Sequence, residues 1–229
     1  MRIPRRHMER DIMQDILTEF EDRIDPAHSA VLVVDIQNDF CHPEGYLGRK
    51  YGCDEAANEA LAARNVALTD AARQAGALIV WIQAIYDPVY LSAPMLMKGG
   101  SKGNEVRCVD GSWGADFYNV APKEGDLVVR KHRYSAFSGT AMDNLLRRNG
   151  IRTTVVTGVS TNICVESTLR EAFNLGYYVV VPRDCVASNN AELHEATLKN
   201  VEFLLGDLTS ASDLMTHWSG GQAETAAAE

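Results

Sequence analysis

The sequence predicts an α/β protein built on an open, mostly parallel sheet with helices on both faces. Short apolar runs rich in β-branched residues alternate with helical segments from residue 29 to residue 205. Strands that are buried on both faces of a parallel sheet give runs of this kind. The chain has 229 residues, of which 46% are hydrophobic. It is therefore long enough and apolar enough to bury the core of one α/β domain.

Six segments have the pattern of strands and four have the pattern of helices. The first strand is an uninterrupted apolar run that leads into Asp35, and three of the helices are expected to end where Gly76, Gly150 and Gly176 follow. The predicted strands cover residues 30–36, 77–83, 126–131, 153–158, 177–181 and 203–205. The predicted helices cover residues 53–75, 140–149, 162–175 and 190–200.

Three segments lie outside this alternation. Residues 7–23 carry apolar side chains at helical spacing, so we expect residues 1–28 to be a helical arm that packs on its own domain or on a second subunit. Residues 84–125 form a long connection, which in a compact domain is usually a lid or a binding loop. The domain is expected to cover residues 29–215, and the Ala-, Gly- and Glu-rich residues 216–229 are expected to be a flexible tail.

Composition excludes several classes of partner. The formal net charge of −9 argues against binding to nucleic acid or to an anionic membrane. No apolar run approaches the roughly 18 residues of a membrane span, and residues 9–22 are charged where a signal peptide needs an apolar core. The five cysteines include no Cys-x-x-Cys pair, which is typical of reduced thiols. We therefore expect a cytoplasmic protein with a small-molecule ligand.

Three chemically reactive side chains are predicted to meet at one edge of the sheet. Asp35 ends the first strand, Lys131 ends the third, and Cys164 follows the fourth where a loop enters a helix. Ligands of open α/β sheets bind at the carboxyl ends of the strands, which is the edge that these residues share. Each residue also fits an ordinary role, as a turn aspartate, a surface lysine or a packed cysteine. Their convergence on one edge favours catalysis.

These three groups together suit nucleophilic catalysis. An unperturbed thiol has a pKa of about 8.5, and a helix N-terminus with a cation nearby lowers it. Lys131 can supply that charge, so we expect a lowered pKa for Cys164. Asp35 can take the thiol proton and later deliver it to a leaving nitrogen. Backbone N–H groups before the helix can hold an oxyanion.

Three segments resemble the isochorismatase-like, or cysteine hydrolase, superfamily. They are Val33-Val34-Asp35-Ile36-Gln37-Asn38-Asp39-Phe40, Lys131-His132-Arg133-Tyr134-Ser135-Ala136-Phe137 and Gly158-Val159-Ser160-Thr161-Asn162-Ile163-Cys164-Val165-Glu166-Ser167-Thr168. The resemblance implies a Rossmann-like, six-stranded parallel sheet, with Asp35 as base, Lys131 stabilising the thiolate and Cys164 as nucleophile. It also implies a cis peptide between Val159 and Ser160, and an oxyanion hole formed by the N–H groups of Ser160 and Cys164. We expect no cofactor, and a homo-oligomer that is a dimer or a tetramer.

Within the superfamily, the sequence is most similar to amidohydrolases of small linear ureides, such as the ureidoacrylate enzymes and the biuret and triuret hydrolases. Isochorismatases proper need no thiol, so Cys164 indicates C–N hydrolysis through a thioester. Nicotinamidases add a metal site with paired histidines after the second strand, where residues 83–90 hold no His; the resemblance therefore implies no metal and no nicotinamide. Ala84 stands where the ureidoacrylate enzymes place an amide. N-carbamoyl amino acid and maleamate-type amidases, and a non-thiol ether or ester hydrolase, therefore stay open.

Aromatic and amide side chains dominate the expected substrate pocket, although each also fits a core or surface role. The candidates are Phe40, Asn38, Gln83, Tyr86, Trp113 and Tyr134. Arg133 is the expected anion-binding residue, because Arg130 should point to the opposite face of its strand. This set suits a small, planar, largely uncharged ligand with at most one carboxylate. Two further alternatives are a non-catalytic binding protein, which the complete set of reactive residues disfavours, and nucleotide binding, for which residues 99–103 lack the spacing of a phosphate loop.

Overall fold

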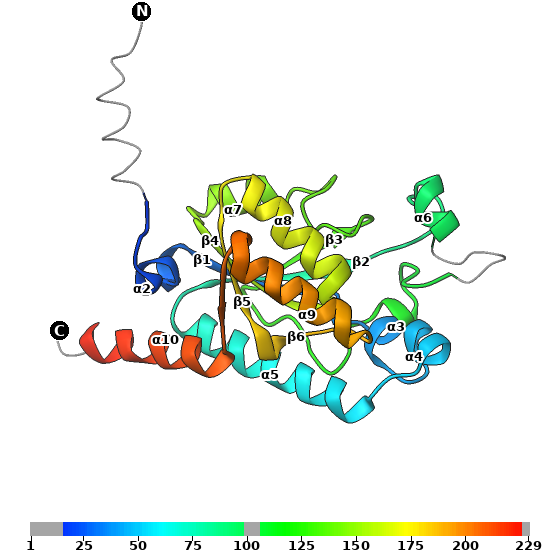
Figure 1. Cartoon of the computed structure of the whole chain (residues 1–229), viewed down its shortest axis with the longest axis horizontal. Helices are drawn as coiled ribbons and strands as arrows, with labels where there is room; N and C mark the ends of the chain where they lie inside the picture. Colours follow the sequence, from blue (N-terminus) through cyan, green and yellow to red (C-terminus); the bar gives the residue numbers. More distant parts are fainter. Residues whose placement is uncertain (1–15, 99–105, 226–229) are drawn as a thin grey trace, which may run out of the picture.

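The computed structural model describes residues 16–98 and 106–225 of the chain, and these contain one parallel sheet (Figure 1). Its continuous strand order is β3-β2-β1-β4-β5-β7, and the short strand β6 pairs with β4 outside this path. The strands are β1 (Ser29–Val34), β2 (Leu78–Ala84), β3 (Leu127–Lys131), β4 (Thr153–Val159), β5 (Tyr178–Pro182), β6 (Val186–Ala187) and β7 (Asp207–Thr209). The predicted open parallel sheet is therefore confirmed.

The sheet gathers the carboxyl ends of its central strands at one edge. Strand β1 lies between β2 and β4, with Val34 aligned with Ile82 on one side and with Gly158 on the other. Strand β3 follows β2, with Lys131 aligned with Ala84. Every residue of β1 and β4 is buried, which agrees with the apolar run of β1 and with the valine- and threonine-rich sequence of β4.

Helices cover both faces of the sheet (Figure 1). On one face, α7, α8 and α9 contribute Leu146, Leu169 and Leu198 to the core. On the other face, α5 and α10 contribute Leu68 and Leu214. The helices are α2 (Phe20–Arg23), α3 (Asn38–Cys41), α4 (Tyr46–Tyr51), α5 (Glu55–Gln74), α6 (Ala93–Lys98), α7 (Met142–Arg148), α8 (Glu166–Asn174), α9 (Ala191–Asn200) and α10 (Ala211–Thr225), with short helical turns η1 (Pro26–His28), η2 (Trp113–Ala115), η3 (Thr161–Val165), η4 (Arg183–Cys185) and η5 (Val201–Leu205).

The predicted strand at residues 203–205 is wrong. These residues belong to η5, a π-helical turn that continues α9, and the last strand begins at Asp207. Leu205 is buried, whereas Phe203 and Leu204 are 85% and 67% exposed. So short an apolar run fits either a strand or one turn of helix. Here Gly206 ends the helical turn before the strand begins.

Both ends of the chain differ from the prediction. Residues 7–15 of the predicted N-terminal helix lie outside the described residues, residues 16–19 are not helical, and α2 covers only Phe20–Arg23. Of the predicted flexible tail, residues 216–225 belong to α10, which continues to Thr225, and residues 226–229 lie outside the described residues; the flexibility of the tail stays a prediction. Trp218 anchors α10, since it is buried and its indole Nε1 donates a hydrogen bond of 2.8 Å to the carbonyl oxygen of Ile24.

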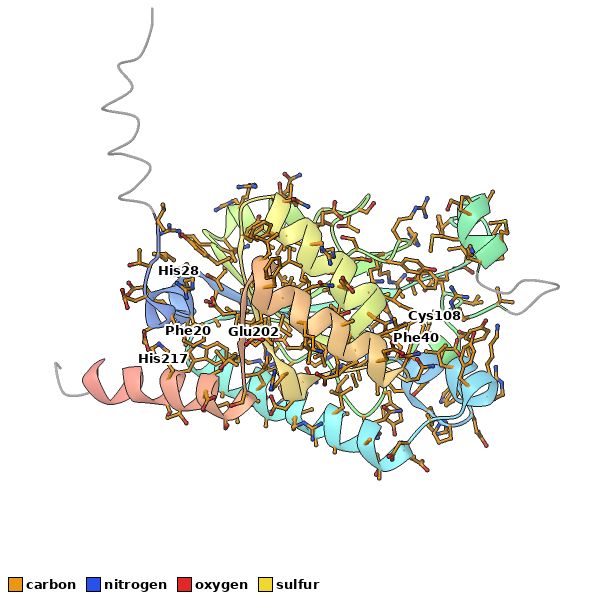
Figure 2. The ribbon with its side chains drawn as sticks, in the orientation of Figure 1. Phe20, His28, Phe40, Cys108, Glu202 and His217 are labelled. Atoms are coloured by element: carbon orange, nitrogen blue, oxygen red, sulfur yellow. The ribbon has the colours of Figure 1, made fainter. Side chains whose placement is uncertain are left out.

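The long connection between β2 and β3 lies at the carboxyl edge of the sheet. It contains α6 and η2, and residues 99–105 lie outside the described residues. Cys108 from this connection packs against Phe40, and Figure 2 shows both at the opposite end of the molecule from His28, which precedes β1. Among the described residues, no helix combines the length and the apolar character needed to cross a membrane.

Candidate active site

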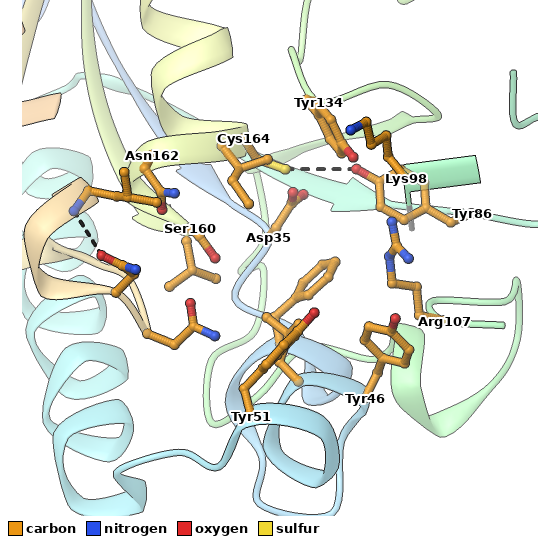
Figure 3. A pocket seen from close by; sticks show the side chains of 17 residues that line it. Asp35, Tyr46, Tyr51, Tyr86, Lys98, Arg107, Tyr134, Ser160, Asn162 and Cys164 are labelled. Carbon is orange, nitrogen blue, oxygen red and sulfur yellow. Dashed lines mark hydrogen bonds between the residues drawn. The ribbon is translucent and has the colours of Figure 1, made fainter. Parts of the chain in front are cut away.

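The three predicted reactive residues come together at the carboxyl edge of the sheet. Asp35 directly follows β1, Lys131 is the last residue of β3, and Cys164 lies in η3, the π-helical turn between β4 and α8. Asp35 and Cys164 line the same pocket, and Figure 3 shows their side chains directed into it. In the structure, these three residues therefore lie at the edge of the sheet that the strand pattern predicted.

Gly158 allows β1 and β4 to approach closely just before the site. It is paired with Val34 and has a φ of +100°, which favours glycine. A Cβ at this position would overlap the backbone carbonyl oxygen of Val34. Glycine is therefore required where the two strands deliver Asp35 and Ser160 to the pocket.

Asp35 and Lys131 form a buried ion pair. Lys131 Nζ lies 2.7 Å from Asp35 Oδ2, and both side chains have 0% exposure. Lys131 Nζ also donates hydrogen bonds to the carbonyl oxygen of Arg133 at 3.0 Å and to the Tyr86 hydroxyl at 3.3 Å. Apart from this ion pair, no hydrogen bond of ordinary geometry reaches either Asp35 oxygen from the described residues, although the Cys164 thiol lies close enough to favour the charged carboxylate. Asp35 therefore has acceptor capacity left for a proton or a substrate N–H.

Burial dominates the protonation equilibria of the three groups. It raises the pKa of Asp35 above its usual range, although Lys131 acts in the opposite direction. Burial alone would lower the pKa of Lys131, but Asp35 and the thiol raise it by more. Burial raises the pKa of Cys164 to about 12, because it outweighs the nearby Lys131 charge. The expected lowering of the thiol pKa is therefore wrong for the free protein.

Tyr86 connects the ion pair with the thiol. Its hydroxyl lies 3.8 Å from Cys164 Sγ and accepts from Lys131 Nζ. The same hydroxyl is 3.5 Å from the carbonyl oxygen of Arg133. Tyr86 is 1% exposed, so its position beside the sulfur is fixed by packing as well as by these contacts.

The turn before Cys164 has the cis peptide bond that the resemblance implies. The peptide bond between Val159 and Ser160 is cis. The Ser160 carbonyl oxygen accepts from the N–H groups of Ile163 at 2.9 Å and Val165 at 3.3 Å. These bonds come from the residues on either side of Cys164. The assignment of the Ser160 and Cys164 N–H groups to an oxyanion hole stays a prediction.

Side chains of the first sequence motif build the frame of the site. Gln37 Nε2 donates to the carbonyl oxygens of Ala84 at 3.0 Å and Ala115 at 2.8 Å, and so ties β2 to η2. Asn38 Nδ2 donates to the carbonyl oxygen of Trp113 at 2.7 Å. These buried amides hold the long connection against the end of β1.

The pocket has a volume of about 540 Å³ and contains half of the predicted substrate-binding residues. Phe40, Tyr86 and Tyr134 line it, together with Asp35 and Cys164. Figure 3 shows Lys98, Arg107 and Tyr46 on one side of Asp35 and Cys164, and Ser160 and Asn162 on the other. A pocket of this size accepts a small molecule.

Three predicted pocket residues are not among the lining residues. Asn38 and Gln83 donate to backbone carbonyl oxygens within the frame, and Gln83 Nε2 reaches Ala115 at 2.9 Å. Trp113 is 48% exposed and packs edge-on against His42. Each of these side chains supports the long connection, which is a role that residue type alone does not separate from substrate binding.

The cations that line the pocket are also different from the one predicted. Arg133 donates to the carbonyl oxygens of Tyr90 and His132, both at 2.7 Å, and is not a lining residue. Lys98 and Arg107 line the pocket instead. They flank residues 99–105 of the long connection, and their position in the sequence gave no signal that ranked them above other surface cations. Among the described residues, no group of three or more His, Cys, Asp or Glu side chains could hold a metal ion.

Comparison with known proteins identifies relatives of the whole domain. The isochorismatase domain model matches residues 29–213. The chain is 36% identical over 198 residues to ureidoacrylate amidohydrolase RutB of Methylobacterium radiotolerans, covering 80% of this chain and 76% of that protein.

Solved structures share the same fold. A cysteine hydrolase from Pseudomonas syringae pv. phaseolicola 1448A has a TM-score of 0.76 and 23% identity, over 86% of this chain and 95% of its own. N-carbamoylsarcosine amidase from Thermoplasma acidophilum has a TM-score of 0.65 and 27% identity, over 80% of this chain and 96% of its own. The family match covers most of the chain and confirms the resemblance seen in the sequence motifs. The chain belongs to the isochorismatase family.

Proposed function

We propose that the protein is a cysteine-dependent amidohydrolase that cleaves a C–N bond of a small linear ureide or amide. Its relatives make it a hydrolase of carbon–nitrogen bonds other than peptide bonds. One observation supports the cysteine mechanism above all. Asp35, paired with Lys131 at 2.7 Å, and Cys164 line the same pocket, so a base, a cation and a nucleophile meet at one place.

In the proposed reaction, Asp35 takes the proton of Cys164, and the thiolate attacks the carbonyl carbon of the substrate. The oxyanion that forms is held by the N–H groups of Ser160 and Cys164. The C–N bond breaks as Asp35 gives its proton to the leaving nitrogen. Asp35 then deprotonates a water molecule that attacks the thioester, which releases the acid product and restores the thiol.

The raised thiol pKa agrees with this sequence of steps. Ionising Cys164 by losing a proton to water would leave a net negative charge in a buried site, which is unfavourable. Transfer of the same proton to Asp35 keeps the sum of the three charges unchanged, with Lys131 positive throughout. The raised pKa of Asp35 makes it a better proton acceptor. The thiolate is therefore formed by internal transfer while substrate is bound.

A linear ureide is the substrate class that the relatives and the pocket favour. The relative with 36% identity is named for ureidoacrylate hydrolysis, and the pocket of about 540 Å³ suits a small ligand. Biuret- and triuret-type ureides belong to the same class. An N-carbamoyl amino acid is the second candidate, because a structural relative with 27% identity is named for carbamoylsarcosine. A maleamate-type amide and a non-thiol ether or ester remain alternatives for the same fold.

We further propose that the enzyme is cytoplasmic, works without a cofactor and forms a homo-oligomer. All five cysteines are free thiols, which suits a reducing compartment. The exposed side chains of Phe203 and Leu204 support an interface between subunits, because monomers seldom expose large neighbouring apolar groups.

A substrate screen with a matched cysteine control tests the proposed function. Wild-type enzyme, Cys164→Ala and Cys53→Ala are incubated with ureides, carbamoyl amino acids, amides and esters, and the products are identified by mass spectrometry. Cys53 is the exposed control thiol. We expect C–N cleavage of a ureide or amide by the wild type and by Cys53→Ala, and none by Cys164→Ala. Activity on esters alone, or activity that survives Cys164→Ala, would contradict the proposal.

A further inference from the structure

We propose that Arg107 binds a carboxylate of the substrate and thereby selects a ureide that carries an acid group at the end away from the cleaved bond. This inference rests on the proposed function, because it concerns the same pocket. It narrows the sequence-based expectation of a largely uncharged ligand with at most one carboxylate, and it replaces Arg133 by Arg107 as the anion-binding residue. The support comes from the charge of the pocket wall, from the packing of Arg107 and from the difference in charge between the two sides of the pocket.

The pocket wall is cationic although the protein is strongly acidic. The charged lining residues are Asp35, Lys98 and Arg107, and the charge of Asp35 is compensated by Lys131. Two positive charges are left, in a chain with a formal net charge of −9. A cationic wall in an acidic protein attracts an anion to this place in particular.

Arg107 is held ready for a ligand by aromatic packing. Its guanidinium carbon lies 5.3 Å from the ring centre of Tyr46 and 5.2 Å from that of Tyr86. Both tyrosines are buried, with exposures of 6% and 1%. Within the described part of the chain, no carboxylate forms an ion pair with Arg107. Stacking on ring faces leaves the N–H groups at the guanidinium edge available, and these match a carboxylate in geometry.

Asp39 fixes the two segments that form this arrangement. Its Oδ1 accepts from the N–H of Tyr46 at 2.9 Å, and its Oδ2 accepts from the N–H of Cys108, next to Arg107, at 2.6 Å. Asp39 is 7% exposed. A buried carboxylate thus joins the start of α4 to the segment that carries Arg107. The subsite is supported by packed structure and does not depend on a surface side chain alone.

The two sides of the pocket differ in charge. Lys98 and Arg107 lie on one side of Cys164, and Ser160 and Asn162 lie on the other (Figure 3). Asn162 Oδ1 accepts from Ser188 Oγ at 2.7 Å, which leaves its amide N–H groups for another partner. An acidic ureide fits this arrangement with its carboxylate on Arg107, its carbamoyl group toward Asn162 and its carbonyl carbon at the sulfur. Tyr86 contacts both Arg107 and the nucleophile, since its ring packs against the Arg107 guanidinium and its hydroxyl contacts Cys164 Sγ.

The test compares a ureide acid with its neutral isostere. The substrates are 3-ureidoacrylate and 3-ureidoacrylamide, labelled at the ureido carbon so that release of labelled CO2 reports only ureide cleavage. The proteins are wild type, Arg107→Met, Arg107→Lys and the control Arg130→Met. Arg130 is an exposed surface arginine whose ion pair with Asp110 is 3.1 Å long, and it does not line the pocket.

We expect wild type to prefer the acid. Arg107→Met should raise KM for the acid by about 10- to 100-fold, the usual effect of losing a hydrogen bond to a charged group. The kcat for the acid and both constants for the amide should stay within a few-fold of wild type. Arg107→Lys should fall between the two, because a lysine keeps the charge and loses the planar fork. Arg130→Met should behave as wild type.

Several results would overturn the inference. They are a wild-type preference for the neutral isostere, an equal loss on both substrates in Arg107→Met, or no loss on either. Failure of the proposed function gives a different result, namely no cleavage of any ureide by wild type. In that case, calorimetric titration of Cys164→Ala with the acid and the amide, with and without Arg107→Met, still decides the matter. Weaker binding of the acid alone would support the inference, and unchanged binding would overturn it.

Discussion

Lys131 Nζ lies 2.7 Å from Asp35 Oδ2, and neither side chain is exposed to solvent. Each charge therefore depends on the other for compensation, because little water can stabilise either one. The pair lies at the carboxyl ends of β3 and β1, two strands that are not neighbours and have β2 between them. The contact thus links the arrangement of the sheet to the charge state of the pocket.

The two single substitutions that break this ion pair should destabilise the fold by different amounts. Asp35→Asn leaves a buried ammonium without its partner and should lower the free energy of unfolding by about 3–5 kcal/mol. Lys131→Met should cost less, because the raised pKa of Asp35 allows the carboxyl to become neutral. The double variant should cost less than the sum of the two single variants. Urea unfolding of all four proteins measures this coupling, and strictly additive losses would contradict it.

The value of kcat/KM should fall at acid pH and should not fall as the pH rises through neutrality. Asp35 acts as a base only when it is ionised, so activity falls as the pH drops through its pKa, which burial raises above 3.8. Lys131 keeps its proton beyond 10.5, and the Cys164 thiol has a pKa of about 12. Activity should therefore stay level from the upper end of this acid decline to about pH 10. A half-maximal point at or below 3.8, or an alkaline decline near neutrality, would disagree with these assignments.

The Tyr86 hydroxyl should contribute to the chemical step. It lies 3.8 Å from Cys164 Sγ and 3.3 Å from Lys131 Nζ. Tyr86→Phe should lower kcat by about 10-fold, as expected for loss of one hydrogen bond, with little change in KM because the ring remains. Tyr118→Phe provides a control, since Tyr118 is buried but does not line the pocket. An unchanged kcat in Tyr86→Phe would show that the hydroxyl is only structural.

Gly158→Ala should disturb the site through the backbone. The added Cβ meets the Val34 carbonyl, and the φ of +100° is unfavourable for alanine. We expect a loss of about 2–5 kcal/mol in the free energy of unfolding. Gly176→Ala is the matched control, because Gly176 also has a positive φ, of +92°, but has open space around it. Equal losses in the two variants would mean that strand contact is not the cause.

The sequence predicted the parts of the site that the sheet itself positions. Asp35 follows the buried apolar run of β1, Lys131 is the last residue of β3, and Cys164 lies in the helical turn η3 between β4 and α8. Parallel strands bring their carboxyl ends to one edge, so these three positions followed from strand assignment alone. The family resemblance then added the cis peptide between Val159 and Ser160, which the structure has.

The remaining features depend on contacts that local sequence does not encode. Arg107 reaches the pocket because Asp39 holds the neighbouring Cys108 N–H, a contact between residues 69 positions apart. The thiol pKa was predicted with the wrong sign because the strength of burial at Cys164 is a tertiary property. Residues 203–205 form a helical turn because they continue α9, which their own composition does not reveal.

Detection of a covalent intermediate on Cys164 tests the proposed mechanism most directly. Wild-type enzyme is mixed with excess ureide, quenched with acid within one turnover and digested, and each cysteine peptide is weighed by mass spectrometry. We expect the carbamoyl or acyl group on Cys164 alone, and we expect Cys164→Ser to keep its fold while losing several orders of magnitude in turnover. A substrate-derived group on Cys41, Cys53, Cys108 or Cys185, or near-normal turnover by Cys164→Ser, would contradict the assignment of Cys164 as the nucleophile.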